Sequence, residues 1–147
     1  MNTLSAIRGA CLVTLGGAAL TACSSMNSVP TIDTVLLDRT GQNGRACIDA
    51  SDINGFGVLE KDVISIDARQ KYYLATVMPG CNDLALSPRA LFHERFGEVC
   101  GGGMDSMRTG GDKCTLKHIY EFDDRSAAFA AHEEAIKRQK ALRDAEQ

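Results

Sequence analysis

Four cysteines in the middle of the chain constrain its fold more than any other feature: Cys47, Cys81, Cys100 and Cys114. An even number of cysteines in an exported chain points to disulfide bonds, because compartments outside the cytosol are oxidising. Four thiols allow three pairings. Cys100 and Cys114 flank a glycine-rich segment, so we expect them to close a hairpin, which leaves Cys47 to pair with Cys81. Each bridge stabilises a fold by about 3 to 4 kcal/mol in the loop-entropy model.

The first 23 residues indicate export. A short start with Arg8 as its only charge is followed by an apolar run from Ala10 to Leu20, which is shorter than the roughly 20 residues that span a bilayer. The run ends in Leu20-Thr21-Ala22-Cys23, which resembles a bacterial lipobox. We expect residues 1–22, a lipoprotein signal peptide, to be removed together with Cys11. The alternatives are an ordinary signal peptide or a buried core helix.

In lipoproteins, the cysteine of the lipobox becomes the first residue and carries diacylglycerol and a further acyl chain such as palmitate. Two or three acyl chains give stable membrane attachment, where one is marginal. Residues 23–43 are predicted to be the lipidated Cys23 and its tether, of which Ser24 to Thr31 is the flexible part. In enteric bacteria, an Asp directly after the lipidated cysteine commonly keeps a lipoprotein at the inner membrane. This chain has Ser24 there, so its resemblance to that rule favours the periplasmic face of the outer membrane.

Size and charge limit the remaining possibilities. Cleavage leaves 125 residues, the length of one compact domain. Without residues 1–22 the formal charge changes from −3 to −4, and the chain has no Trp and no basic stripe. Nucleic-acid binding therefore has little support.

Residues 44–124 are predicted to form a β domain. The strand candidates are 45–49, 56–59, 63–66, 72–78, 91–96 and 114–122, and Asn54-Gly55 is expected to be a turn. Residues 91–96 also fit a turn of helix. In the last strand, alternation places five side chains on one face: Cys114, Leu116, His118, Tyr120 and Phe122. The predicted fold class is α+β, mainly β: a small antiparallel sheet or partly open barrel, stapled by two disulfides, with a C-terminal helix.

The C-terminal helix is predicted over residues 125–147, where the sequence becomes rich in alanine and in charge. Asp124 or Ser126 can cap it. Its first half is expected to pack on the sheet through Phe129 and Ile136. Its end either projects into solvent or binds a partner.

Metal binding is an alternative for some of the same residues, since Cys100, Cys114, His118 and His93 offer sulfur and imidazole, the ligands that zinc prefers. Close Cys-x-x-Cys pairs are absent, however, so oxidation to disulfides is the favoured interpretation. His118 is then either a surface residue of a strand or a hydrogen-bonded core residue.

Three other motifs fail on inspection. His132-Glu133-Glu134 lacks the second histidine of a zinc helix, because residue 136 is Ile. A calcium loop around Asp52 would place Ala50 and Lys61 at essential ligand positions. The glycines at 101–103 and 110–111 lack a phosphate-binding signature and are expected to form a mobile loop. We therefore assign no catalytic, cofactor-binding or metal-binding residue and expect no cofactor.

The residues around the cysteines carry a family resemblance: Arg45-Ala46-Cys47-Ile48, Cys81, Cys100 and the run from Gly111 to Ile119. They resemble a family of small Gram-negative envelope lipoproteins known only as a domain of unknown function. The likeness covers about residues 44–122. It implies a disulfide-stapled β domain and no established activity.

Together these features predict a lipid-anchored protein on the periplasmic side of the envelope. The leading hypothesis is a binding or structural accessory without catalytic activity, whose partners are the membrane, through its lipid, and an envelope protein. One alternative is a small metal-handling protein or enzyme that uses His93, His118 and nearby acids. Another is an inhibitor of a hydrolase.

Overall fold

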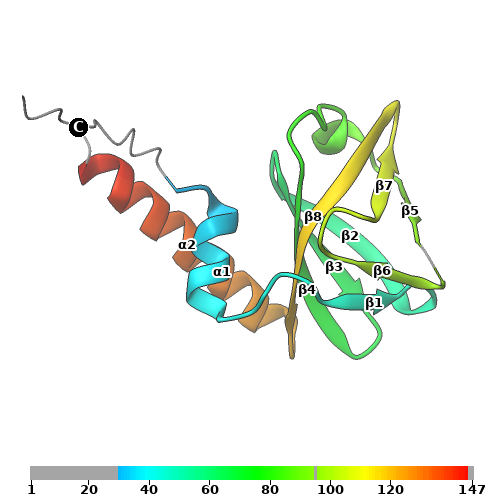
Figure 1. The fold of residues 1–147 in the computed structure, drawn as a ribbon, viewed down its shortest axis with the longest axis horizontal. Helices are drawn as coiled ribbons and strands as arrows, with labels where there is room; N and C mark the ends of the chain where they lie inside the picture. The colour runs from blue at the N-terminus through cyan, green and yellow to red at the C-terminus, as the bar shows by residue number, and fades with distance from the viewer. Residues whose placement is uncertain (1–29, 95, 146–147) are drawn as a thin grey trace, which may run out of the picture.

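The structure is a computed structural model that describes residues 30–94 and 96–145. Figure 1 shows a curved sheet and a pair of helices packed beside it. In chain order the elements are α1 (Ile32–Thr40), β1 (Cys47–Asp49), the 3-10 helix η1 (Ala50–Asp52), β2 (Ile53–Glu60), β3 (Val63–Ala68), β4 (Lys71–Val77), the 3-10 helix η2 (Leu84–Leu86), β5 (Ala90–His93), β6 (Glu98–Cys100), β7 (Ser106–Thr109), β8 (Asp112–Phe122) and α2 (Arg125–Ala145). The predicted fold class, mainly β with a C-terminal helix, is confirmed. No helix in this described part is long and apolar enough to cross a membrane.

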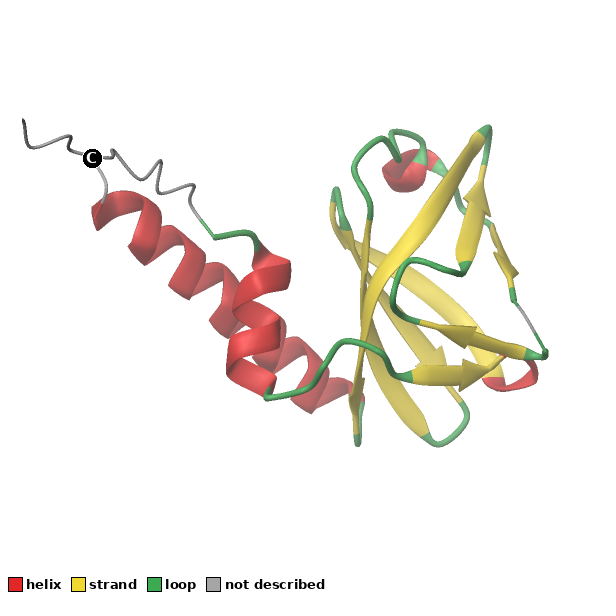
Figure 2. Cartoon of the chain, in the orientation of Figure 1, coloured by secondary structure: helices red, strands yellow, loops and turns green. Residues whose placement is uncertain are grey.

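The main sheet is antiparallel and curls into a half-barrel (Figure 2), with the strand order β2-β3-β4-β8-β7-β5. Its two edge strands meet through side chains: Phe56 of β2 and Phe92 of β5 pack edge to face with ring centroids 6.5 Å apart. A separate antiparallel pair, β1 and β6, contributes Ile48 and Val99 to the interior. The interior of the half-barrel is thereby filled without a closed ladder of hydrogen bonds.

Two apolar cores lie on opposite faces of β3, β4 and β8. The barrel core is inside the curve and includes Ile64, Ile66, Tyr73, Ala75, Val77, Met107, Leu116 and Ile119. The helix-side core lies between the sheet and the helices and comprises Ile32, Val35, Leu36, Val63, Tyr72, Leu74, Tyr120, Ala128 and Ala135. Because β3 and β4 are covered on both faces, they consist mostly of buried residues. Each large apolar side chain buried in this way contributes about 1.5 to 3 kcal/mol.

A bulge in β8 changes which face its side chains occupy. Consecutive residues of β4 pair with His118 and Leu116, which leaves Lys117 as an extra residue. An inserted residue reverses the alternation that follows it. Leu116 therefore faces the barrel core, while Tyr120 packs in the helix-side core. The prediction that one face of this strand carries every second residue from Cys114 to Phe122 is wrong for this reason.

The segment predicted as a tether contains a helix. The expected tether covers residues 23–43, but residues 32–40 form α1, which is capped by Thr31 and ends at Gly41 in the left-handed conformation, with φ 65°. Ile32, Val35 and Leu36 have helical spacing and are buried. So short a helix depends on tertiary packing for its stability. The part of the expected tether before Pro30 lies outside the described residues.

The predicted C-terminal helix is present as α2. The carboxylate of Asp124 accepts a hydrogen bond from the Ala127 amide at 2.8 Å, as expected for a cap. Phe129 and Ile136 pack against the helix-side core as predicted. They share that core with α1, so the two helices form one layer on the sheet.

One predicted turn and one predicted strand need correction. Asn54-Gly55 lies inside β2, where Asn54 Nδ2 donates to Asp67 Oδ1 of β3 at 2.9 Å, so this hydrogen bond joins the strands and the chain reverses after Glu60 instead. The strand predicted over residues 91–96 is confirmed only for its first part, as β5. Phe96 has φ 60° and follows the strand in a turn.

Candidate functional site

The most polar buried site surrounds the carboxylate of Asp33, which is 6% exposed. We call it the Asp33 cluster. Its hydrogen bonds to Oδ1 come from His118 Nδ1 at 2.7 Å, Thr76 Oγ1 at 2.8 Å and Tyr120 Oη at 2.9 Å. Lys117 Nζ forms an ion pair with Oδ2 at 2.6 Å. The cluster joins α1 to β4 and β8.

The bulge in β8 is what makes this cluster possible. In a regular strand, Lys117 and His118 would point to opposite faces. The extra residue lets both side chains reach the same carboxylate. Asp33 also lies in the first turn of α1, where the helix dipole favours a negative charge.

The imidazole of His118 is held from two sides. An ionised carboxylate only accepts hydrogen bonds, so Nδ1 carries the proton that is donated to Asp33. On the other side the ring packs against Gly44, where an added Cβ would lie 2.7 Å from ring carbons. Gly44 therefore leaves the space that the ring occupies. His118 is hydrogen-bonded as one of its two predicted roles requires, but its side chain is 22% exposed, so it is half-buried and not a core residue.

Burial and hydrogen bonding act in opposite directions on Asp33. Burial alone raises the pKa of its carboxyl, but the donors Lys117, His118, Thr76 and Tyr120 outweigh this effect and hold the pKa below the usual value of 3.8. Burial, together with the neighbouring charge of Asp33, raises the pKa of the Tyr120 hydroxyl far above its usual value. The site thus keeps an ionised carboxylate and a neutral phenol.

An imidazole oriented by a carboxylate is the arrangement of many general bases, which act on a nearby hydroxyl or thiol. Among the described residues, the hydroxyls of this site, Thr76 and Tyr120, donate to Asp33 and not to His118. The side-chain hydrogen bonds of the cluster go to the carboxylate of Asp33 on α1, and Tyr120 also donates to the main-chain oxygen of Asp33. The cluster therefore links α1 to the sheet through residues that are far apart in the sequence, since Asp33 and His118 are 85 positions apart.

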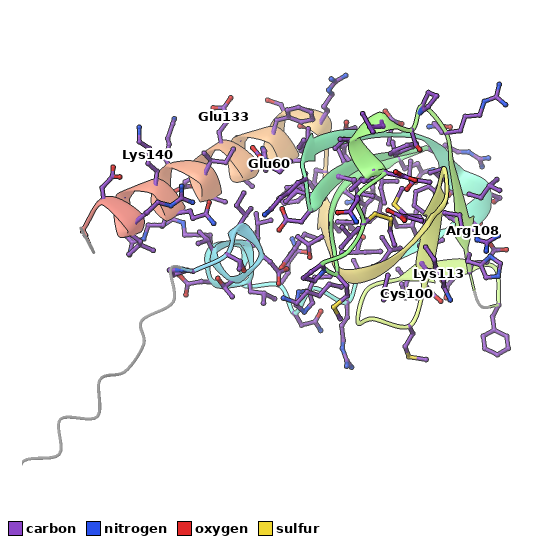
Figure 3. All side chains as sticks on the ribbon, turned by 90° about the horizontal axis from the view of Figure 1, so that it is seen from above. Glu60, Cys100, Arg108, Lys113, Glu133 and Lys140 are labelled. Carbon is purple, nitrogen blue, oxygen red and sulfur yellow. A yellow bond between two sulfur atoms is a disulfide. The ribbon has the colours of Figure 1, made fainter. Side chains whose placement is uncertain are left out.

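His93 lies outside this cluster, two strands away from β8 in the sheet. It is on β5 and lines a hollow of about 240 Å³ with Ser106, Arg108 and Lys113. Figure 3 shows Arg108 and Lys113 on this side of the sheet. Two cations beside His93 disfavour a metal ion there. The predicted alternative ligand set of His93 and His118 with two cysteines is not brought together.

The structure pairs the cysteines differently from the expectation. The bridges are Cys47–Cys100 and Cys81–Cys114, with Cα atoms 4.1 Å and 5.3 Å apart. The predicted pairs Cys47–Cys81 and Cys100–Cys114 are wrong because the glycines after Cys100 do not close a hairpin. The amides of Gly102 and Gly103 instead donate to carbonyls of β8, so these glycines are hydrogen-bonded rather than a mobile loop.

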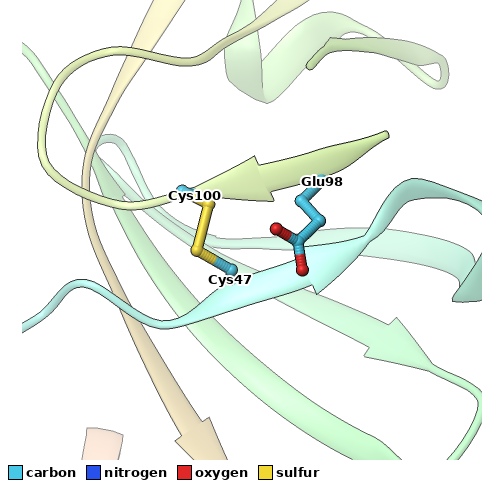
Figure 4. A group of neighbouring side chains, drawn as sticks. All are labelled: Cys47, Glu98 and Cys100. Atoms are coloured by element: carbon cyan, nitrogen blue, oxygen red, sulfur yellow. A yellow bond between two sulfur atoms is a disulfide. The ribbon is translucent and has the colours of Figure 1, made fainter. Parts of the chain in front are cut away.

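One trio of potential metal ligands gathers within residues 30–94 and 96–145: Cys47, Cys100 and Glu98, whose ligand atoms lie within 4.8 Å of one another. Figure 4 shows the reason. Cys47 and Cys100 face each other across β1 and β6 and are joined by their disulfide, while Glu98 lies two residues before Cys100 on β6. Sulfurs joined to each other are not thiolate ligands.

His132 is buried in α2, and its Nε2 has no hydrogen-bond partner among the described residues. Burial lowers the pKa of its imidazole below 6.5, although the charges of Glu60 and Glu133 act in the opposite direction. The residue one turn later is Ile136, which packs on the helix-side core. His132 is therefore a core residue of the helix layer.

An open groove of about 510 Å³ runs along β2 beside the first turn of α2. Its floor includes Gly55 and Gly57, and its wall includes Arg125, which lies 5.0 Å from the ring of Phe129. Among the described residues that line it, Asn54 and Asp67 hydrogen-bond to each other between β2 and β3.

One protein family matches most of this chain. A family model described as a family of unknown function, DUF6491, matches residues 6–139. The chain belongs to DUF6491. The match includes α1, the whole half-barrel and α2 as far as Gln139, so the DUF6491 unit comprises the sheet together with both helices. No curated protein and no solved structure matches the chain. The predicted membership in an unknown-function family is confirmed.

Sequence reasoning missed Asp33 and Thr76 as partners of His118. The only local signal was an acidic residue two positions after the cap Thr31. Neither α1 nor the bulge was predicted, and both are needed to bring these residues together.

Proposed function

We propose that this chain is a lipid-anchored protein of the bacterial cell envelope, facing the periplasm from the outer membrane, and that it serves as a binding or structural accessory without catalytic activity. The observation that carries the proposal is the pairing of all four cysteines in residues 24–147 into two disulfides. Such pairing suits an oxidising compartment. The lipobox that ends in Cys23 supplies the route to it.

The polar groups support the non-catalytic part of the proposal. Asp33, His118 and Tyr120 are engaged with one another at the joint between α1 and the sheet. His93 lies in a separate hollow beside two cations. The residues that an envelope enzyme or metal carrier would need are thus divided between two separate places on the half-barrel.

The anchoring is tested by expressing the full chain in a Gram-negative host and measuring the mass of its N-terminal peptide. We expect a peptide that begins at Cys23 and carries acyl chains, in the outer-membrane fraction. Cys23→Ser should abolish acylation, while Cys11→Ser, which lies in the removed leader, serves as the matched control and should leave it intact. An unmodified amino terminus, or a cytosolic chain with four reduced thiols, would contradict the proposal.

The non-catalytic role is tested by metal analysis of protein purified under oxidising conditions, combined with thiol titration. We expect no stoichiometric metal and no free thiol among the four paired cysteines. Stoichiometric zinc or copper together with free thiols would favour a metal-handling protein instead.

A further inference from the structure

Positive charge is concentrated in the C-terminal half of α2. From Ile136 to Ala145 the helix contains four exposed cations and one acidic residue, the exposed Asp144; the cations are Lys137, Arg138, Lys140 and Arg143. Figure 3 shows Lys140 extending from the outer side of the helix. The chain without its leader carries a formal charge of −4. This half-helix is therefore a basic end on an acidic protein, and we call it the basic end of α2.

The same half-helix lies where the described chain begins. Gln139 Nε2 donates to the main-chain oxygen of Pro30 at 3.0 Å, and Arg39 at the other end of α1 forms an ion pair with Glu134. The helices are therefore antiparallel, and Figure 1 shows α1 beside the middle of α2, whose C-terminal end extends farther from the sheet. Pro30 follows Cys23 by seven residues, which span at most about 25 Å.

We propose that the basic end of α2 lies against the anionic phospholipid headgroups of the membrane that holds the acyl chains of Cys23. This inference rests on the proposed lipid anchor. A short connection to the lipid keeps the helix close to the headgroups, and four exposed cations attract an anionic surface over the Debye length of about 8 Å at physiological salt. An acyl chain combined with a basic patch is a common pair of membrane signals.

The contact sets the orientation of the domain. Salt screens electrostatic interactions beyond the Debye length. The acidic remainder of the protein is therefore repelled only weakly by the anionic membrane once it is held away from the surface. The half-barrel, with the hollow lined by His93, Arg108 and Lys113, lies at the opposite end of the molecule from Lys140 (Figure 3). That end is left free to face the periplasm and a partner.

The test uses the protein as purified from membranes, after mass spectrometry of its N-terminal peptide has shown whether it carries acyl chains. It is reconstituted into phosphatidylcholine vesicles with or without phosphatidylglycerol and treated with a water-soluble acetylating reagent. On the anionic vesicles we expect Lys137 and Lys140 to react more slowly by about threefold or more, with recovery in high salt. Lys113, at the far end, is the internal control and should react equally on both vesicles.

Two variants make the test specific. R138Q/R143Q removes two of the four cations while leaving the reporter lysines Lys137 and Lys140, and it should restore much of the reactivity of these lysines on anionic vesicles. R108Q, on the far side of the sheet, should not restore it. An acylated protein whose Lys137 and Lys140 react equally on the two vesicles would overturn this inference alone. A protein without acyl chains would count against the anchor and against the inference built on it.

Discussion

Removing the Asp33 carboxylate should be among the most destabilising single changes in this protein. Asp33→Ala deletes the acceptor of three hydrogen bonds and the partner of one ion pair at the joint between α1 and the sheet. It leaves buried donors behind, because Tyr120 is 0% exposed and Thr76 is 2% exposed. The Tyr120 hydroxyl retains one acceptor, the main-chain oxygen of Asp33 at 3.1 Å.

The expected magnitude follows from these contacts. A hydrogen bond to a charged group contributes about 1.5 to 3 kcal/mol, and a buried polar group left unpaired costs about 1 to 3 kcal/mol. These terms do not add fully, since the donors share one oxygen and relax together. We therefore expect Asp33→Ala to lower the free energy of unfolding by about 3 to 5 kcal/mol, as for other broken buried ion pairs.

Urea unfolding of the oxidised protein, followed by circular dichroism, measures this loss. With a slope of about 2 kcal/mol per molar urea, the midpoint should fall by about 2 M. Asp38→Ala is the matched control, because Asp38 is an exposed carboxylate on the same helix. Tyr120→Phe should cost less, and the double variant with Asp33→Ala should show coupling of about 0.5 kcal/mol or more.

The pH dependence gives an independent check. Because folding lowers the pKa of Asp33, its contribution is complete above the usual value of 3.8 and is lost as the pH falls through the lowered value. The difference between the native protein and Asp33→Asn should therefore shrink in strong acid. Equal unfolding midpoints for Asp33→Ala and Asp38→Ala, or no coupling with Tyr120→Phe, would refute the reasoning.

Three further changes have defined outcomes. Folding lowers the pKa of His132, so thermal stability should decline as the pH falls below 6.5, and His132→Leu should remove that decline; an unchanged pH profile in the variant would contradict this. Gly101→Ala should lower the free energy of unfolding in urea by about 3 kcal/mol, because an added Cβ would clash with main-chain atoms of Gly44 and Ile119. Gly55→Ala, where a Cβ meets open space, should leave that free energy unchanged, and similar losses for the two variants would contradict the observed packing around Gly101. Limited reduction should open Cys47–Cys100 before the other bridge, because Cys47 is exposed, as alkylation and peptide mass spectrometry would show.

Most of the strands could be predicted because their signals are local. The run from Tyr72 to Met78 is dense in aromatic and β-branched residues, and β4 covers nearly all of it. The cap Asp124 and the change to alanine-rich sequence mark α2 in the same way. The prediction of a turn at Asn54-Gly55 was wrong because a turn signal of two residues is weaker than the pairing of β2 along the whole of β3.

The candidate site could not be predicted in this way. Its acid and its histidine are 85 positions apart, and nothing near either residue in the sequence indicates the other. Alternation in β8 gave the right element but the wrong face beyond Lys117, because a bulge depends on the register with a neighbouring strand. Helix α1 was missed since its short apolar stripe becomes stable only against α2 and the sheet.

The sequence by itself determined the strand-rich composition of the fold, the C-terminal helix and an even set of cysteines able to pair. These properties reside in residue type and short-range periodicity. Only the tertiary structure decided which cysteines are partners, which face of β8 carries His118 and where Asp33 finds its donors. Those outcomes depend on strand register and on contacts between distant segments, which local propensities do not encode.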